Sequence, residues 1–530
     1  MDRSVDITVV GAGFAGMYAI HRARALEMSV QVFEAGTDVG GTWYWNRYPG
    51  ARCDVESVEY SYSFDDDLQQ DWEWTERYSS QPEILRYAQH VADRFNLRKD
   101  IQFSTRVISA HFDETTSTWE TRTDRGDVVR SQFIIFATGC LSSTNIPHFE
   151  GADTFTGTTY HTGQWPHEGV DFTGQRVGII GTGSSAVQSI PKIAEQAKHL
   201  YVFQRTASFA VPARNEDINH DYVRWVKENY STFRDANRQM SAAFGSTVPR
   251  GEKSALEVSH DELWADLEER WQRGGFGFLS GFTDFLLDKR ANDLVSDFVR
   301  SKIADIVKNP ETAHHLMPSQ VLGCKRLIID TGYYETFNRD NVTLVPVDSH
   351  PIERITSAGI VVNSKEFECD TIVYATGFDA MTGSLLKIDI RGRNYQSLSD
   401  AWNAGPVTYL GLMTSGFPNM FMVSGPGSPS VLTNMIMSIE QHVEWITDCF
   451  ERMRATGMQC IETSDSAQDE WVHYVNAVAE RTLYPSCNSW YLGANVEGKP
   501  RVFMPLIGFP GYVTKCNEVV ESGYQGFQFS

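Results

Sequence analysis

Two glycine-rich loops constrain the fold of this 530-residue chain more than any other feature. The first, GAGFAG at 11–16, follows the apolar run 6–10, and the second, GTGSSA at 181–186, follows the apolar run 176–180. A glycine turn between a strand and a helix places dinucleotide phosphates at the helix N-terminus. The pattern therefore predicts an α/β protein with two Rossmann-like domains and two dinucleotides, one of which hands electrons to the other.

The first loop has the full βαβ context, with helical character over 17–26 and a strand over 30–34. Gly11 permits the tight turn, Gly13 lets the backbone approach a pyrophosphate, and Gly16 allows the helix to pack on the sheet. Glu34 lies 18 residues after Gly16, where a carboxylate accepts hydrogen bonds from ribose hydroxyls.

The second unit differs at the end of its second strand, 200–203, which is followed by Gln204, Arg205 and Thr206 and by no acid. A carboxylate there would repel a 2′-phosphate, whereas an arginine holds one with its two-pronged guanidinium. The sequence therefore predicts NADP as the second cofactor. The alternative from the residues alone is an arginine that is merely solvated at a strand end.

Composition limits the partners and the compartment. The net charge of −22 argues against a nucleic-acid partner, because phosphates must be met by Lys and Arg. No apolar run approaches the roughly 18 residues of a membrane span, and no signal-peptide pattern opens the sequence. The eight cysteines form no CxxC, so we expect no metal site, no disulfide framework and a cytoplasmic location.

Several longer motifs resemble the type I Baeyer–Villiger monooxygenases, and the similarity runs from Asp6 nearly to the C-terminus. Their pattern FxGxxxHxxxW is met by Phe155, Gly157, His161 and Trp165. Within the family, the GPGSPSVL segment at 425–432 is most similar to the phenylacetone monooxygenase branch. The other matching segments are GGTWYWNRYPGARCD at 40–54, KRL at 325–327, ATGFD at 375–379 and NSWY at 488–491.

The resemblance implies a domain plan. Strands 133–139 and 371–377 both end in Ala-Thr-Gly, which suggests one crossing point out of each Rossmann domain. Between them, apolar residues recur at helical spacing over 294–307, and Ser259 with Glu262 resembles a capping box. We therefore expect an FAD-binding domain over 1–141 and 378–530, an NADP-binding domain over 142–213 and 326–377, and a helical insertion over 214–325.

The resemblance also implies an activity. Family members use FAD, NADPH and dioxygen to insert one oxygen atom beside a ketone carbonyl, which gives an ester or a lactone. The oxygenated flavin must stay a deprotonated peroxide to attack the carbonyl, and a permanent cation would stabilise that anion. Arg326 matches the family's catalytic arginine, and Asp54 matches the acid that holds it. Without the motif, nothing would indicate that two charged residues 272 positions apart act together.

Further site residues follow from the same matches. Lys325 and Arg205 match the groups that bind the 2′-phosphate, and Trp490 matches a residue that covers the nicotinamide. His161 is better explained as a structural or hinge residue than as an acid or base. The expected FAD contacts are Gly11, Gly13, Phe14, Ala15, Gly16, Glu34, Gly41, Thr42, Trp43, Asp54, Tyr60, Val107 and Met435. The expected NADP contacts are Arg52, Asp54, Thr182, Gly183, Ser184, Ser185, Gln188, Arg205, Thr206, Lys325, Arg326 and Trp490.

The substrate pocket is expected at Cys140, Leu432 and Met435. Cys140 stands where the nearest branch carries a glutamine, so the pocket differs there. Ordinary core packing is nearly as good an explanation of Leu432 and Met435. The expected partners are a small ketone and dioxygen, with no membrane and with a monomer or weak oligomer as the assembly.

Three other functions are alternatives. A flavin-containing monooxygenase that oxygenates nitrogen or sulfur has the same two-domain plan, but its fingerprint does not usually end in Trp, as this one does at Trp165. A disulfide reductase needs two close cysteines after the first loop, and Cys53 stands alone there. A non-catalytic flavin sensor would keep the glycine loops but would not need Arg326, Asp54 and Trp490 together.

Overall fold

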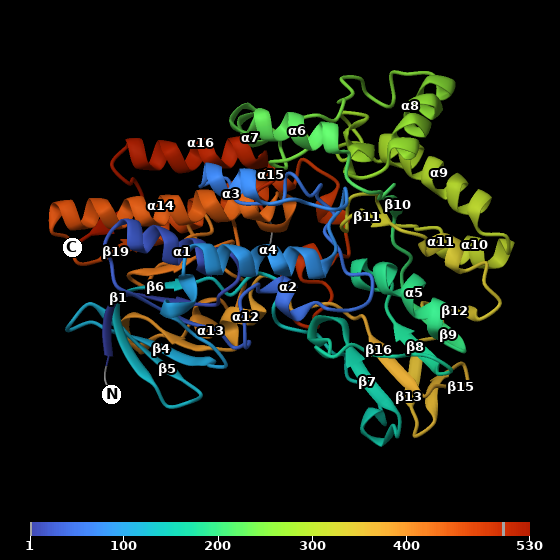
Figure 1. The fold of residues 1–530 in the computed structure, drawn as a ribbon, viewed down its shortest axis with the longest axis horizontal. Helices are drawn as coiled ribbons and strands as arrows, with labels where there is room; N and C mark the ends of the chain where they lie inside the picture. The colour runs from blue at the N-terminus through green and yellow to red at the C-terminus, as the bar shows by residue number, and fades with distance from the viewer. Residues whose placement is uncertain (1–2, 501–503) are drawn as a thin grey trace.

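The structure is a computed structural model that describes residues 3–500 and 504–530. The first sheet lies at one end of the molecule and the second at the other, and the helical insertion stands above the second sheet (Figure 1). Long helices from the C-terminal part of the chain cover the first sheet, so one domain is built from both ends of the sequence.

The first sheet has the strand order β17-β4-β5-β6-β1-β2-β3, with β18 also paired to β6. Its centre, β6-β1-β2, is parallel, and β4, β5 and β6 pair antiparallel. The central strand β1 is almost entirely apolar after Asp6 and is buried there, as expected for a parallel strand covered on both faces. The strands are β1 (Arg3–Val10), β2 (Val30–Phe33), β3 (Ile101–Gln102), β4 (Val107–Asp113), β5 (Thr118–Thr123), β6 (Val128–Phe136), β17 (Asp389–Arg391) and β18 (Met420–Met422).

Helices α1 and α14 pack against each other over this sheet, and α16 packs on α14. In the described part of the chain, no helix is both long and apolar enough to cross a membrane. A two-stranded sheet, β19 (Ile461–Thr463) with β20 (Phe527–Phe529), closes the C-terminus. The helices are α1 (Phe14–Ala25), α2 (Thr42–Trp45), α3 (Asp66–Asp71), α4 (Gln81–Arg94), α12 (Gly383–Leu386), α13 (Leu398–Ala401), α14 (Met435–Thr456), α15 (Asp465–Ala479) and α16 (Gly508–Glu521).

The second sheet is parallel throughout and has the order β12-β9-β8-β16-β7. Helix α5 follows the second glycine loop as α1 follows the first. The elements are β7 (Thr158–His161), β8 (Arg176–Ile180), α5 (Ser184–Gln196), β9 (His199–Gln204), α11 (Tyr333–Thr336), β12 (Val342–Pro346), β16 (Thr371–Tyr374) and the antiparallel β13 (Ile352–Ile355), β14 (Gly359–Val362) and β15 (Lys365–Glu368). The predicted fold class, two dinucleotide-type α/β domains, is confirmed.

The two glycine loops meet the Ala-Thr-Gly strand ends in the same way. Gly11 has φ +104°, and a Cβ there would lie 2.6 Å from the carbonyl oxygen of Ala137. Gly181 has φ +114°, and a Cβ there would lie 2.4 Å from the carbonyl oxygen of Ala375. Only glycine satisfies both the backbone angle and the contact. Each strand end therefore passes directly beside the loop of its own domain.

The insertion leaves the second domain after β10 (Ala210–Pro212) and returns at β11 (Ile328–Asp330), which pair in parallel. The Ser259 hydroxyl caps α8 by accepting a hydrogen bond from the Glu262 amide at 3.3 Å. The Glu262 side chain pairs with Lys253. Of the two reciprocal hydrogen bonds of the expected capping box, the one accepted by the Ser259 hydroxyl is therefore the one that forms. The helices are α6 (His220–Glu228), α7 (Tyr230–Arg238), α8 (His260–Arg273), α9 (Lys289–Ile306) and α10 (Pro310–Leu316).

The cysteine prediction is wrong at one point, because Cys324 and Cys487 form a disulfide bond with their Cα atoms 5.5 Å apart. They are 163 residues apart in the chain and show no local spacing that marks a pair. The fold brings them together where the end of the insertion meets the C-terminal segment. The other six cysteines are buried and free.

Candidate active site

Arg326 and Asp54 form an ion pair between the two domains. The Arg326 Nε and Nη2 atoms donate to the two Asp54 carboxylate oxygens, each at 2.8 Å. Its third nitrogen, Nη1, donates to the Val431 carbonyl oxygen at 2.7 Å. Arg326 follows Lys325 just before β11, Asp54 lies in the loop after α2, and Val431 lies in the 3₁₀ turn Ser430–Leu432 before α14. Three segments distant in sequence thus fix one guanidinium plane.

The charge of Arg326 is secured by its surroundings. Burial alone would lower the pKa of the guanidinium, but the Asp54 carboxylate outweighs it, so that the pKa is raised above its ordinary value. The side chains are 19% and 28% exposed, so the pair is partly screened by solvent. Arg326 is therefore a permanent cation at every working pH.

Phe276, in the insertion, packs against the same group. The Arg326 Cζ atom lies 4.5 Å from the Phe276 ring centroid, a cation–π distance. Neither Phe276 nor Val431 was predicted. The carbonyl of Val431 has no residue-type signal, and Phe276 sits in an apolar stretch that resembles ordinary core.

Arg326 lies between two cavities, and both it and Lys325 line each of them. The first cavity, of about 570 Å³, opens between the two glycine-loop domains. Most of the predicted NADP contacts line it, together with two of the predicted FAD contacts. These are Arg52, Thr182, Gly183, Ser184, Ser185, Arg205, Thr206, Lys325, Arg326 and Trp490, with Thr42 and Trp43.

Two cations, Lys325 and Arg205, line this cavity and repel each other. Burial and the neighbouring Arg205 lower the pKa of the Lys325 ammonium. Within the described part of the chain, neither Lys325 nor Arg205 has a carboxylate partner in an ion pair. A bound dianion would relieve this repulsion, so the pair fits a 2′-phosphate.

Other predicted NADP contacts are engaged with protein groups. The Arg52 guanidinium pairs with Glu76 at 2.7 Å, although its side chain lines the first cavity. Gln188 does not line that cavity: it accepts a hydrogen bond from the Tyr48 hydroxyl at 2.8 Å and donates to the Arg52 carbonyl at 3.1 Å. Gln188 thereby joins α5 to the first domain. The Thr182 hydroxyl donates to the Thr206 carbonyl at 2.8 Å.

Both glycine-loop helices are suited to phosphates. Gly13 and Gly183 cap α1 and α5, neither helix has a side-chain cap at this end, and neither carries an acid in its first turn. A Cβ on Gly183 would meet no atom within 4 Å, whereas one on Gly41 would lie 2.9 Å from the Gly13 Cα. The α5 amides therefore face open space that a pyrophosphate can fill, whereas at α1 Gly13 and Gly41 pack too closely for a side chain on either. With no acid and no side-chain cap at either helix start, the residues present fit the phosphates of FAD and NADP.

Glu34 follows β2 and is buried beside the first loop. Its carboxylate oxygens accept hydrogen bonds from the Ala12 amide at 2.8 Å and the Gly36 amide at 2.7 Å. Burial raises the pKa of Glu34, although these amides oppose the change. The side chain thus braces the glycine loop, a role that comes in addition to the predicted ribose contact.

Further predicted FAD contacts fall into three groups. Trp43 donates from Nε1 to the Tyr60 hydroxyl at 3.1 Å, and Phe14 packs edge-on against Tyr60 with ring centroids 6.1 Å apart. Ala15 and Gly16 are buried in the first turn of α1. Val107 is buried at the start of β4 in the sheet core, and lines neither cavity.

The fingerprint residues lie around β7, at the edge of the second sheet. The His161 Nδ1 atom accepts a hydrogen bond from the Gly163 amide at 2.9 Å, and its ring packs edge-on against Phe378. Burial lowers the pKa of His161. A Cβ on Gly157 would clash with the Asp370 carbonyl at 2.3 Å. Trp165 is buried in the core of the domain, and Phe155 packs on a neighbouring cluster.

The predicted substrate-pocket residues share one apolar cluster. Cys140, Leu432 and Met435 pack there with Trp490 and Tyr491. Leu432 also lines the second cavity, of about 650 Å³, whereas Cys140 and Met435 line neither cavity. Apolar and aromatic side chains line much of the second cavity; the aromatic ones include Phe244, Phe276, Phe282, Phe285 and Tyr484. Charged residues also line it: Asp54, Glu56, Glu59, Arg77, Arg250, Lys325 and Arg326.

The fold and this site define a class: a redox enzyme in which two dinucleotides meet beside a fixed cation. A profile of the flavin-binding monooxygenase-like family matches residues 4–236. A Baeyer–Villiger monooxygenase of Pseudooceanicola batsensis is 43% identical over 98% of this chain and 95% of that protein.

Two solved structures of related monooxygenases are similar to this chain over almost its whole length. An oxidised steroid monooxygenase bound to NADP has a TM-score of 0.94 and 50% identity over 99% of each chain. OTEMO in complex with FAD and NADP has a TM-score of 0.96 and 40% identity over the whole of each chain. The chain therefore belongs to the Baeyer–Villiger monooxygenases, as the sequence predicted.

Proposed function

We propose that this enzyme oxidises a ketone to an ester or lactone with FAD, NADPH and dioxygen. FAD reduced by NADPH supplies the oxygen activation, and the protein supplies charge, orientation and shelter from water. The observation that carries the proposal is the Arg326–Asp54 pair at the junction of the two cavities. Arg326 is the catalytic residue in this proposal.

Arg326 stabilises negative charge that develops at the reacting oxygen and at the carbonyl. It suits this role because it keeps its own proton and so cannot quench an anion by protonating it. Asp54 and the Val431 carbonyl hold the guanidinium plane in place before the reaction, so little reorganisation is needed. A protonated oxygen donor suited to nitrogen or sulfur nucleophiles would not require this fixed cation.

The cofactor roles follow the geometry of the two loops. The α1 N-terminus binds the FAD pyrophosphate, with Trp43 and Tyr60 near the flavin end, and the α5 N-terminus binds the NADP pyrophosphate. Lys325 and Arg205 hold the 2′-phosphate, and Trp490 shelters the nicotinamide end from water.

The substrate enters the second cavity. Its volume of about 650 Å³ and its aromatic walls favour an apolar ketone larger than acetone or cyclohexanone. Leu432 contacts it, and Cys140 and Met435 shape the wall behind Leu432. We further propose that the enzyme works as a monomer or weak oligomer in the cytoplasm, where NADPH is regenerated.

The test is a panel of purified-enzyme reactions with cyclic, aryl and polycyclic ketones, analysed by mass spectrometry, alongside a thioether and a tertiary amine. The expected result is a product 16 mass units above the ketone, identified as an ester or lactone by its fragments. Sulfoxide or N-oxide as the sole product, with every ketone unchanged, would refute the proposal and support nitrogen or sulfur oxygenation.

A further inference from the structure

We propose that the Cys324–Cys487 disulfide is a reversible link that positions the nicotinamide-covering segment against the catalytic arginine, and so couples NADPH consumption to ester formation. The inference rests on the proposed function of the first cavity. In it, Cys324 and Cys487 are positioning residues that act through Arg326 and Trp490.

The two sulfur atoms join the walls of the first cavity. Cys324 directly precedes Lys325 and Arg326, and Cys487 stands three residues before Trp490. Both walls contribute to the cavity: Lys325 and Arg326 from one side, and Asn488, Trp490 and Asn495 from the other. The bond therefore sets the distance between the cations and the residue proposed to shelter the nicotinamide.

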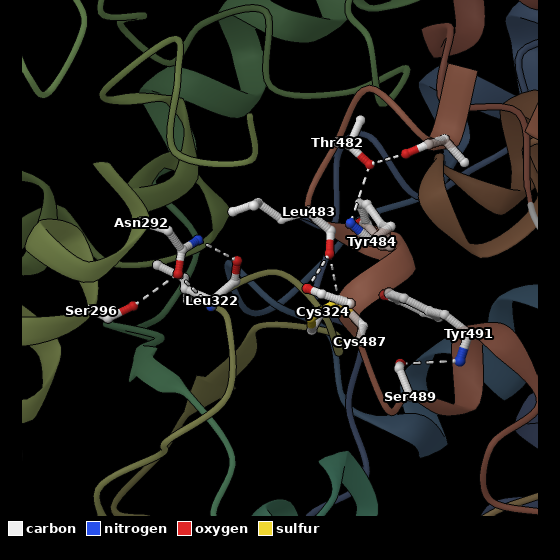
Figure 2. Close-up of a disulfide and its surroundings, with 12 residues drawn as sticks. Asn292, Ser296, Leu322, Cys324, Thr482, Leu483, Tyr484, Cys487, Ser489 and Tyr491 are labelled. Carbon is white, nitrogen blue, oxygen red and sulfur yellow. Dashed lines mark hydrogen bonds between the residues drawn. A yellow bond between two sulfur atoms is a disulfide. The ribbon is translucent and has the colours of Figure 1, made fainter. Parts of the chain in front are cut away.

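The wall that carries Cys324 is firmly anchored. Asn292 of α9 donates from Nδ2 to the Leu322 carbonyl and accepts from the Leu322 amide through Oδ1, each at 2.9 Å (Figure 2). The same Nδ2 also donates to the Phe285 carbonyl at 2.7 Å. Asn292 is only 1% exposed, so these hydrogen bonds are shielded from water.

The wall that carries Cys487 is anchored at its ends. The Leu483 amide donates to the Leu286 carbonyl at 2.9 Å, and Asn495 Nδ2 donates to the Phe378 carbonyl at 2.8 Å. Between them the chain folds on itself in two short 3₁₀ turns, Tyr484–Ser486 and Trp490–Leu492. Figure 2 shows the disulfide beside these turns, with Tyr491 and Ser489 just beyond it. The covalent link thus transfers the rigidity of the α9 side to the middle of this segment.

Hydrogen peroxide is sufficient to form the Cys324–Cys487 bond, and a dithiol is sufficient to break it. Hydrogen peroxide, the by-product of uncoupled NADPH oxidation, takes one hydrogen from each thiol; the S–S bond forms and two waters leave. A dithiol reverses this by exchange and departs as its own cyclic disulfide. Both cysteines are 3% exposed, so exchange requires the segment to open. Disulfides in a reducing cytoplasm are usually of this redox-responsive kind.

The experiment compares the oxidised holoenzyme, the same enzyme after dithiol treatment, and the double variant C324S/C487S. Cys460, buried in the core of the first domain, provides the control variant C460S. Three quantities are measured: alkylatable thiols after unfolding without reductant, NADP⁺ affinity by calorimetry, and the fraction of consumed NADPH that appears as hydrogen peroxide with ketone present.

The oxidised enzyme should yield six thiols, and the dithiol-treated enzyme eight. If the closed segment falls to about a tenth of the population on reduction, the NADP⁺ dissociation constant rises about tenfold. The peroxide fraction should rise in the reduced and double-variant enzymes, and dithiol should change neither property of the double variant. C460S should respond to dithiol as the parent does.

Eight thiols in the untreated enzyme, or equal affinity and peroxide fraction in both redox states, would overturn the inference. If the double variant does not fold, the reduced parent enzyme alone decides the question. If no ketone gives an ester in any state, the proposed function fails, whereas the thiol count and the NADP⁺ affinity still test the positioning role.

Discussion

Replacing Asp54 with Asn tests how Arg326 is held. The substitution preserves the shape of the side chain but removes its charge and one of two charge-assisted hydrogen bonds. Such bonds contribute about 1.5–3 kcal/mol each, and partial exposure of the pair reduces this to about 1–2 kcal/mol. If this energy holds the guanidinium in its reactive position, ester formation should fall about 5- to 30-fold.

The control is Asp100→Asn, which removes the charge from another arginine–aspartate pair at similar exposure, one in which the Arg24 Nε and Nη2 atoms both donate to a single Asp100 carboxylate oxygen. Both variants should unfold at similar denaturant concentrations and keep their yellow colour. Only Asp54→Asn should lower kcat for the ester and raise hydrogen peroxide, measured by chromatography and a peroxidase assay. Equal ester rates in the two variants would refute the idea that Asp54 positions Arg326.

Three further changes follow: two test the NADP side of the site, and one tests the second glycine turn. Because the pKa of Lys325 is lowered, its ammonium loses its proton at a lower pH than that of an ordinary lysine. The KM for NADPH should therefore rise as the pH increases through that pKa. In Lys325→Arg, the KM should depend less on pH. Parallel KM–pH profiles for the two proteins would contradict this. Gly183→Val should fold and bind FAD but raise the KM for NADPH at least tenfold, because Gly183 has φ −80° and open space where the phosphate is proposed to lie. Gly181→Ala should instead lower the unfolding temperature, since its Cβ would clash with Ala375 at a positive φ; an equally stable Gly181→Ala variant would count against this explanation.

The fold was predictable because its strongest signals are local. In a loop such as Gly11 to Gly16, six adjacent residues determine the turn, the start of the helix and the close backbone contacts. The second loop repeats them, so both Rossmann-like domains followed from the sequence. The helices of the insertion were visible from the same kind of local periodicity.

The site was less accessible, because its parts meet only in three dimensions. The pairing of Arg326 with Asp54 came from family resemblance, since nothing local links two charges so far apart. The Val431 carbonyl, the Phe276 ring and the Cys324–Cys487 bond carry no pattern at all. Each depends on how the insertion and the C-terminal segment close over the cavity.

Replacing Arg326 with Ala is the most direct test of the central claim, with Arg326→Lys as the variant that keeps a charge but loses the two-pronged geometry. Both purified variants should bind FAD, judged by their absorption spectra, and should still oxidise NADPH. Ester should vanish for Arg326→Ala and be strongly reduced for Arg326→Lys, with hydrogen peroxide accounting for the NADPH consumed. Ester formation by Arg326→Ala at the parent rate would contradict the account.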